Sequence, residues 1–168
     1  MPSPPFGSYT VAVRANIRRA RIEDAPAIAA LVRALGWFAH LSDEPEDATG
    51  ARLARHLELC QADQSHSVYV AEDEASTLAG YAAVHWLPYL FLTGPEGYVS
   101  ELFVDEARRG QGIGAELLEA VRLEAVQRGC CRLMLINKRN RESYQREFYA
   151  RRGWTERPAA ANFVLPLK

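Results

Sequence analysis

Hydrophobic and polar positions along the chain follow two different periods. Short apolar runs that are rich in β-branched and aromatic residues, some of them alternating with polar positions, predict strands. Segments in which apolar residues recur every three or four positions predict helices. The predicted strands are Val11–Arg19, Ser67–Glu72, Leu78–Trp86, Tyr98–Val104, Cys131–Asn137 and Ala161–Leu167. The predicted helices follow Asp24, Thr49 and Gly112, and a further one covers Arg141–Arg152.

The order of these elements predicts the fold class. The second and third strands are joined by the short polar turn Asp73–Thr77, which predicts a hairpin, whereas the later strand–helix–strand unit requires a crossover. We therefore expect an α/β protein with a single-domain, mixed, mostly antiparallel sheet of roughly six or seven strands flanked by about four helices. Residues 1–10 contain three prolines, a glycine and two serines, which predicts a flexible lead-in to a domain that covers residues 11–168.

Composition and charge narrow the class of protein. The chain has 168 residues, of which 48% are hydrophobic and 24% charged, as is typical of a soluble globular domain. Its formal net charge of −1 gives no general attraction to nucleic acid or to anionic membranes, so neither is an expected partner. The longest apolar stretch, Trp86–Leu92, contains a proline and cannot span a bilayer, and the N-terminus lacks the pattern of a secretory signal.

Cysteines and histidines indicate the compartment and the absence of a metal. The three cysteines are odd in number and form no C-x-x-C pair, which fits a reduced, cytoplasmic protein whose thiols fill the core. No Cys/His cluster or H-x-x-x-H pattern occurs, so we expect no metal site.

One stretch, residues 98–127, carries the clearest functional signal. An apolar strand is followed by the charged loop Asp105–Arg109, and Gly110, Gly112 and Gly114 then open an amphipathic helix. The first N–H groups of a helix have no intrahelical partner and lie at the positive end of its dipole, so a turn of this kind can bind a phosphate. Alternate glycines cost stability but let a ligand approach the backbone, and the arginines of the loop add positive charge.

The residues alone leave three interpretations of this turn open. It is an ordinary glycine-containing loop, a dinucleotide-binding turn, or a cradle for the pyrophosphate of coenzyme A. Gly110, Gly112 and Ala115 formally satisfy G-x-G-x-x-G/A, but that turn should directly follow its strand and precede an acidic residue by roughly 20 positions. Here a charged loop intervenes and the next strand ends in Asn137. A nucleoside-triphosphate loop would need a following Gly-Lys-Ser/Thr, which this sequence lacks.

Two motifs resemble a known family. The segment Arg109–Gly114, which reads RGQGIG, matches the Q/R-x-x-G-x-G/A signature of the GNAT superfamily of acyl-CoA N-acyltransferases. The preceding ELFVD of Glu101–Asp105 is similar to the strand before that signature. Phe148-Tyr149 followed by Gly153-Trp154 is similar to the later F-Y-x-x-x-G-F/W segment. The resemblance covers roughly residues 17–167 and implies the GNAT fold for most of the chain.

The resemblance implies acetyl-CoA as the co-substrate and assigns residues to it. The pantetheine arm would run alongside the central strand and the pyrophosphate would lie on the glycine turn. A free backbone N–H near the end of that strand would polarise the thioester carbonyl and stabilise the developing oxyanion. The family's coenzyme-binding asparagine usually stands where this chain has Glu142, so Asn140 or Ser143 is the expected replacement. The other implied residues are Leu102, Phe103, Val104, Arg109, Gly110, Gln111, Gly112, Ile113, Gly114 and Ala115.

Two residues are candidates for acid and base catalysis. By the resemblance, Tyr149 would protonate the departing thiolate, because phenol and thiol have pKa values of about 10 and 8.5, close enough for proton transfer. Alternatively, it only packs against Phe148. Glu101 on the central strand is the candidate base. A carboxylate of pKa about 4.3 must be desolvated or work through water to fill that role, and a strand glutamate could equally pair with an arginine.

The acceptor is expected near the loop 37–49, which is aromatic first and acidic afterwards. The resemblance places acceptor specificity in this region, and its acidic residues would favour a cationic amine. The loop alone is equally well explained as a capped connection between helices with aromatic residues beneath it. The candidate substrate-binding residues are Trp37, His40, His85 and Ser100.

Together, these features predict an acetyl-CoA-dependent N-acetyltransferase that acts by direct attack of a small-molecule or peptide amine in a ternary complex. Two alternatives stay open: a transferase that uses a longer acyl group, and a non-catalytic acyl-CoA-binding sensor of the same fold. Many relatives pair through edge strands, so the resemblance also allows a homodimer.

Overall fold

The computed structural model describes residues 15–167, apart from the side chain of Ser42. The predicted lead-in 1–10 and the first residues of the predicted strand Val11–Arg19 lie outside this range. The chain divides into two units, residues 1–135 and 136–168, which are described separately. No helix in the described part of the chain is long and apolar enough to cross a membrane.

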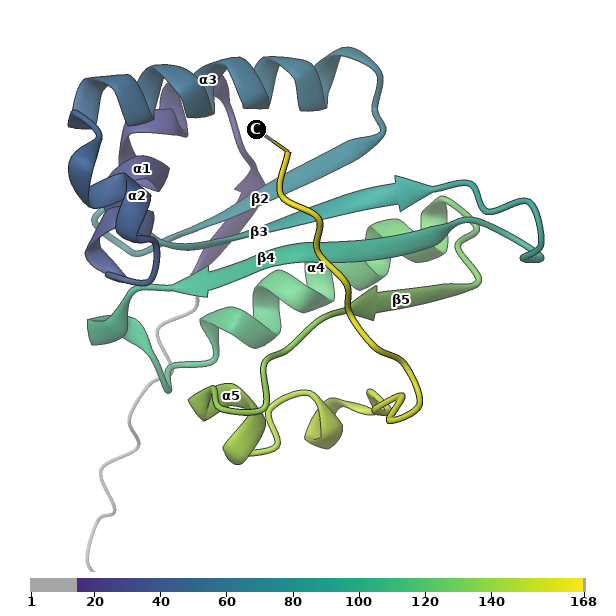
Figure 1. The fold of residues 1–168 in the computed structure, drawn as a ribbon. Coiled ribbons are helices and arrows are strands. Elements are labelled where there is room, and N and C mark those ends of the chain that lie inside the picture. Colours follow the sequence, from purple (N-terminus) through teal and green to yellow (C-terminus); the bar gives the residue numbers. More distant parts are fainter. Residues whose placement is uncertain (1–14, 168) are drawn as a thin grey trace, which may run out of the picture. The chain divides into compact units, whose positions relative to one another are not determined.

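The first unit is built on a five-stranded sheet with the order β1-β2-β3-β4-β5 (Figure 1). The first four strands pair antiparallel in sequence order, and β4 pairs parallel with β5 after a crossover. The strands are β1 (Asn16–Arg19), β2 (His66–Glu72), β3 (Leu78–Leu87), β4 (Glu96–Val104) and β5 (Arg132–Leu135). The mixed, mostly antiparallel α/β fold predicted from the sequence is thereby confirmed.

Helices cover both faces of this sheet (Figure 1). The first face carries α1 (Ala25–Ala34), α2 (Ala39–Asp43) and α3 (Glu46–Ala62), and the second carries α4 (Ile113–Gln127). Val70 belongs to the buried cluster that contains α1 residues, whereas its neighbour Tyr69 bonds to Glu124 of α4. Successive strand residues point to opposite faces, so the two helical layers lie on opposite sides of the sheet.

The number of strands differs from the prediction. The sheet has five strands rather than six or seven, because the predicted strand Ala161–Leu167 has no strand assignment. Its apolar pattern favours a strand, but a strand forms only where its backbone pairs with a neighbour, and Pro166 has no N–H to donate. The side chains of Phe163 and Leu165 are 91% and 83% exposed, so no buried face fixes the segment either.

The predicted helix Arg141–Arg152 is also interrupted. It is replaced by α5 (Glu142–Gln145) and a 3-10 turn at Ala150–Arg152, with Glu147 in the left-handed region at φ 55° between them. Most helix stability in proteins comes from a buried apolar stripe, and neither short helix buries a residue. The loop 37–49, in contrast, contains more helix than predicted, since α2 and the first turn of α3 lie within it.

The second unit holds itself together through aromatic and ionic contacts. The ring centroid of Tyr149 lies 5.0 Å from that of Phe148 and 5.9 Å from that of Trp154. The carboxylate of Glu156 accepts hydrogen bonds from Arg139 at 2.6 Å and from the Tyr144 hydroxyl at 2.9 Å. These contacts fix the chain around α5 although the unit has no sheet among its described residues.

Candidate active site

The glycine turn lies between the end of β4 and the start of α4. Asp105 begins it by accepting a hydrogen bond from the Ala107 N–H at 2.8 Å. Gly110 and Gly112 then adopt left-handed φ values of 80° and 91°, and Gly112 is the N-cap of α4. A Cβ atom built on either glycine meets nothing within 4 Å. The glycines are therefore required by the backbone conformation, and the surface above them is open to a ligand.

The backbone of this turn presents free donors. The first hydrogen bonds of α4 run from the Ala115 and Glu116 N–H groups to the Gly112 carbonyl, at 2.8 and 3.1 Å. The N–H groups of residues 112–114 precede them and have no carbonyl one turn earlier to bond. They can therefore meet an anion at the positive end of the helix dipole. The N–H of Ala115, a residue that the resemblance assigns to the coenzyme, donates to the Gly112 carbonyl within the helix.

The two arginines before the turn have different roles. Arg108 forms an ion pair of 2.6 Å with Asp73 of the β2–β3 hairpin, so it stabilises the fold. Arg109 lies 3.7 Å from the exposed Glu106 carboxylate, and its guanidinium carbon is 5.7 Å from the centre of the Trp37 ring. Arg109 is thus the arginine that remains beside the turn, and it links the turn to the loop after α1.

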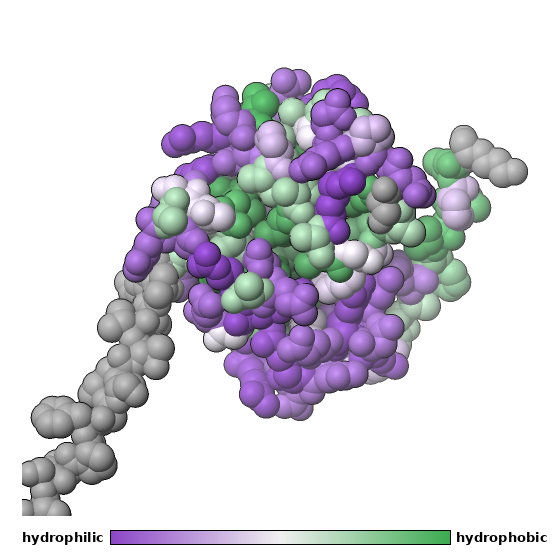
Figure 2. Space-filling view, turned by 90° about the vertical axis from the view of Figure 1, so that its left-hand side faces the viewer, coloured by the Kyte–Doolittle hydropathy of each residue, from purple (hydrophilic) through white to green (hydrophobic). Residues whose placement is uncertain are grey.

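Aromatic side chains bring that loop onto β4. The ring of Phe103 lies 5.7 Å from Trp37, 5.9 Å from Phe38 and 5.6 Å from Tyr81, measured between centroids. His40 is exposed, and its ring centroid lies 6.2 Å from that of Phe38. Figure 2 views the side of the molecule that carries α1 and α2 and shows hydrophobic residues gathered among polar ones. Of the two predicted loop residues, the structure therefore brings Trp37 but not His40 to the central strand.

Half of β4 lacks a strand partner on one side. Strand β5 pairs only with residues 96–99 of β4, so residues 100–104 have no partner strand on that side in the described part of the sheet. An exposed strand edge can pair with an extended ligand through its backbone groups. Leu102, Phe103 and Val104 lie on this free edge, directly before the glycine turn.

A β-bulge interrupts β4 at Ser100. Ala83 pairs with Glu101 and Val84 pairs with Val99, which leaves Ser100 as the extra residue. Bulges redirect side chains and are frequent next to active sites. Here the Ser100 hydroxyl hydrogen-bonds to His85 Nε2 at 2.8 Å.

The His85 ring belongs to a short polar row across the sheet. Its centroid lies 4.2 Å from that of His66 on β2. Burial, together with the nearby His66, lowers the pKa of His85 below its usual value of 6.5, so the ring is neutral at neutral pH. A neutral imidazole can accept a proton or a hydrogen bond.

The structure also provides a partner for Glu101. The Tyr81 hydroxyl donates a short hydrogen bond to Glu101 Oε2, while Oε1 has no hydrogen bond among the described residues. Burial first, and then the charge of Glu101, raise the pKa of Tyr81 far above 10, so the phenol keeps its proton and holds the carboxylate. Glu101 itself is exposed, so one of its oxygens is positioned and the other can meet a substrate or a water. The arginine partner considered for this residue is not found within the described chain.

Three of the predicted site residues, Tyr149, Asn140 and Ser143, belong to the second unit. Burial raises the pKa of Tyr149, which therefore remains a proton donor at neutral pH. Asn140 is exposed, and the Ser143 hydroxyl donates to Asn137 Oδ1 at 3.2 Å. The buried Asn137 Nδ2 has no acceptor among the described residues. An unpaired buried amide is costly, so Asn137 Nδ2 is a donor that a ligand could satisfy.

Sequence reasoning did not single out Tyr81 or His66, and it did not predict the unpaired amide of Asn137. Tyr81 and His85 are four positions apart on β3 and share a face, and the predicted hairpin would have placed β2 beside them. That alternation was the available signal for Tyr81 and His66. No comparable signal existed for the unpaired amide. No group of three or more His, Cys, Asp or Glu side chains that could hold a metal occurs within residues 15–167.

A bulged central strand with a half-free edge leads into an open glycine turn at the head of a helix, which is the arrangement that the resemblance to the acyl-CoA N-acyltransferases implies. Comparison with known proteins makes this specific, because residues 31–154 match the model of the acetyltransferase (GNAT) family. The chain belongs to that family, whose members use acetyl-CoA as co-substrate.

Individual relatives agree with the family assignment. The chain is 31% identical over 125 residues to glucosamine 6-phosphate N-acetyltransferase 1 of Oryza sativa subsp. japonica. The match covers 73% of this chain and 73% of the relative. It is 27% identical over 128 residues to the thialysine N-epsilon-acetyltransferase of Mus musculus, covering 71% of this chain and 72% of the relative. The crystal structure of glucosamine-6-phosphate N-acetyltransferase from Arabidopsis thaliana superposes with a TM-score of 0.72 at 20% identity, over 90% of this chain and 99% of that one.

Proposed function

We propose that this enzyme transfers the acetyl group of acetyl-CoA to a primary amine of a small molecule or peptide, by direct attack in a ternary complex. One observation carries the proposal. Within the single strand β4, a carboxylate held by Tyr81 and a bulge bonded to His85 immediately precede the free edge that leads into the glycine turn. A base, a backbone donor and an anion-binding turn thereby follow one another along the chain. Thioester aminolysis requires groups of these three kinds close to the reacting atoms.

The coenzyme would bind along this line. The pyrophosphate would accept hydrogen bonds from the N–H groups of residues 112–114 and the charge of Arg109, and the pantetheine amides would pair with the free edge at Leu102–Val104. A backbone N–H at Phe103 or Val104 would then polarise the thioester carbonyl. The acceptor would then approach from the side of the loop after α1, where Trp37 lies beside Phe103 of β4.

The acceptor amine must lose a proton before it attacks. Glu101 is the proposed base, working through a water on Oε1, because the hydrogen bond from Tyr81 fixes the carboxylate. The neutral His85 with Ser100 would hold the amine or its displaced proton. Tyr149 is the proposed acid for the departing thiolate on the strength of its motif, and burial keeps its hydroxyl protonated at neutral pH.

The names of the two curated relatives suggest the first acceptors to try. A panel should contain glucosamine 6-phosphate, thialysine, lysine and a short peptide with a free amino terminus. The release of free thiol from acetyl-CoA measures transfer to each. We expect thiol release above background with at least one of these amines. When the amino group of that compound is blocked, thiol release should stay at background.

Two variants make the test specific. Glu101→Gln should lower kcat by roughly 100-fold or more while the KM for acetyl-CoA stays unchanged, because general-base catalysis typically contributes about 10²–10⁴-fold. Glu74→Gln, at the exposed tip of the β2–β3 hairpin, is the matched control and should keep full activity. A thermal shift with acetyl-CoA but no thiol release with any amine would instead identify a non-catalytic sensor. The absence of any shift would contradict the proposed coenzyme site.

A further inference from the structure

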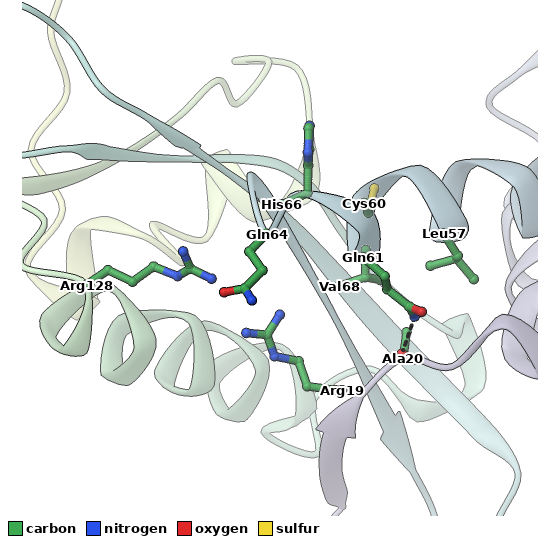
Figure 3. A pocket seen from close by; sticks show the side chains of 9 residues that line it. All are labelled: Arg19, Ala20, Leu57, Cys60, Gln61, Gln64, His66, Val68 and Arg128. Carbon is green, nitrogen blue, oxygen red and sulfur yellow. Dashed lines mark hydrogen bonds between the residues drawn. The ribbon is translucent and has the colours of Figure 1, made fainter.

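A pocket lies at the end of α4 that is remote from the glycine turn (Figure 3). Arg128, one of its lining residues, follows the last residue of α4, whereas the glycine turn precedes the first. The helix has 15 residues, so the two places are about 22 Å apart along its axis. The pocket opens beside the end of β1, where Arg19 and Ala20 line it, and has a volume of about 260 Å³. It is therefore distinct from the glycine turn, although His66, which lies beside His85, also lines it.

Two arginines give this pocket a positive charge. Arg19 and Arg128 both bond to Oε1 of Glu124, the second at 2.8 Å, so two cations share one carboxylate and one positive charge remains. Glu124 is held in place by the Ser67 hydroxyl at 3.0 Å and the Tyr69 hydroxyl at 2.8 Å. The side chain of Glu124 is only 8% exposed, so it cannot turn outward to release its partners.

Aromatic rings fix the orientation of both guanidinium groups. The guanidinium carbon of Arg19 lies 4.9 Å from the centre of the Tyr69 ring, and that of Arg128 lies 4.9 Å from the centre of the Trp86 ring. Stacking of this kind keeps a planar guanidinium rigid and leaves its edges free to donate. Only Nη2 of Arg19 and Nε of Arg128 are used on Glu124. Further N–H groups of both arginines are available to an oxygen anion in the pocket.

The turn that closes the pocket is strained. Gln64 follows α3 and has a left-handed φ of 56°, a conformation that is costly for a residue other than glycine or asparagine. Asp63 fixes the turn by accepting hydrogen bonds from the Ser65 N–H and hydroxyl, at 3.0 and 2.7 Å. Figure 3 shows that the Gln64 side chain points toward the two guanidinium groups. Strain that aims a polar side chain into a pocket indicates a binding role.

The remaining wall is mixed in polarity. Leu57 and Val68 form an apolar part that cannot bond to a charged oxygen, whereas Gln61 and His66 are polar. A bare inorganic anion would leave the apolar part without a partner, whereas a carboxylate with a short aliphatic chain would satisfy both the arginines and the apolar part. The volume is slightly below that of typical ligand sites, about 300–1,000 Å³, which excludes a nucleotide-sized ligand. We propose that this pocket binds a small aliphatic carboxylate, with its carboxylate between Arg19 and Arg128 and its chain against Leu57 and Val68.

Hexanoate is a suitable probe. Titration into the full chain, followed by calorimetry and by changes in amide NMR shifts at the end of α4, should give saturable binding with a dissociation constant on the order of 1 mM. Hexanamide, which has the same chain without the charge, should bind at least tenfold more weakly. Inorganic phosphate tests the charge without the chain. Binding of phosphate but not of hexanoate, or equal binding of hexanoate and hexanamide, would overturn the proposal.

A variant with a built-in carboxylate separates a binding site from a structural ion-pair network. Gln64→Glu places an anion between the two arginines, so the melting temperature should stay equal or rise while hexanoate binding weakens at least tenfold. Gln127→Glu adds the same charge at an exposed position next to Arg128 and should leave binding unchanged. Unchanged hexanoate affinity in Gln64→Glu would refute the site. The acetyl-CoA thermal shift should persist in both variants, so the outcome is independent of the proposed function.

Discussion

The two ends of helix α4 differ in how their charged and polar groups are satisfied. At the N-terminal end, glycines expose the backbone, and a Cβ atom built on Gly110 or Gly112 meets nothing within 4 Å. At the C-terminal end, the carboxylate of Glu124 is enclosed by four donors from β1, β2 and Arg128, which directly follows α4. The N–H groups of the first end are left for a ligand to complete, whereas the carboxylate of the second end is satisfied within the fold. One helix thus combines a site prepared for an anion with a buried anion of its own.

This difference determines what each end contributes. Free N–H groups in an open turn cost little stability, because water satisfies them until the coenzyme arrives. A buried carboxylate is tolerated only if its hydrogen bonds are complete, and breaking one partner leaves the others exposed to the full desolvation cost. We therefore expect changes at the first end to affect coenzyme binding and changes at the second to affect stability.

The largest effect is expected for Glu124→Ala. This change leaves Arg19 and Arg128 without their shared carboxylate and the hydroxyls of Ser67 and Tyr69 without their acceptor. The free energy of unfolding should fall by about 3 kcal/mol. This is the lower end of the range for breaking a buried ion pair, because the Arg19 side chain is half exposed. Urea denaturation at pH 7 followed by circular dichroism measures it.

The control for this variant lies on the same helix. Glu119 forms an exposed ion pair with Arg122 at 2.7 Å, and such pairs contribute little to stability. Glu119→Ala should therefore leave the denaturation midpoint almost unchanged. Equal losses in the two variants would show that the enclosure of Glu124 has no special importance.

The second effect concerns the open end. Gly112→Ala forces a residue with a side chain into the left-handed region at φ 91°, which costs about 1–2 kcal/mol of stability. The new methyl group also projects over the turn, so the KM for acetyl-CoA should rise roughly tenfold, as for the loss of one charge-assisted hydrogen bond. Gly129→Ala, at the other end of the helix with φ 68°, is a matched control for strain. Gly129→Ala should lose a similar amount of stability, and its KM for acetyl-CoA should stay unchanged. A rise in KM in both variants would show that backbone strain alone causes the rise.

These two ends also differ in how far the sequence predicted them. The turn was predicted because its strand, loop and glycines are consecutive, so spacing alone fixes their geometry. The partners of Glu124 could not be predicted, since Arg19 and Ser67 are 105 and 57 residues away in the chain. The pairing of Tyr81 with Glu101 lies between these cases, because it depends on the register and the bulge of two adjacent strands. The segment Ala161–Leu167 was predicted incorrectly for the same reason, as its pattern cannot supply a pairing partner.

A third, smaller effect compares two tyrosines, the buried Tyr81 and the partly buried Tyr69, each of which donates a hydrogen bond to a glutamate. Tyr81→Phe removes the hydroxyl that positions Glu101, and kcat should fall roughly tenfold, as for a lost hydrogen bond to a charged group. Tyr69→Phe removes the same group from Glu124 and should lower stability while kcat is unchanged. Thiol-release kinetics and thermal melts on both variants give the comparison. Loss of stability alone in Tyr81→Phe would remove the catalytic role of the Tyr81–Glu101 pair.

The smallest effect is a dependence of stability on pH that originates at the closed end. Burial alone would raise the pKa of Glu124, but the hydrogen bonds from Arg128 and Tyr69 and the charge of Arg19 lower it below its ordinary value of 4.5. Its stabilising contribution is therefore complete above pH 4.5, where the carboxylate is ionised in the folded and unfolded states alike. As the pH falls below that value, the unfolded chain takes up a proton first, and the contribution is lost until the folded carboxylate is protonated too. The difference in unfolding free energy between the wild type and Glu124→Gln should accordingly be constant at neutral pH and shrink below pH 4.5. A difference that stays constant down to the acid transition would mean that Glu124 keeps an ordinary pKa in the folded protein.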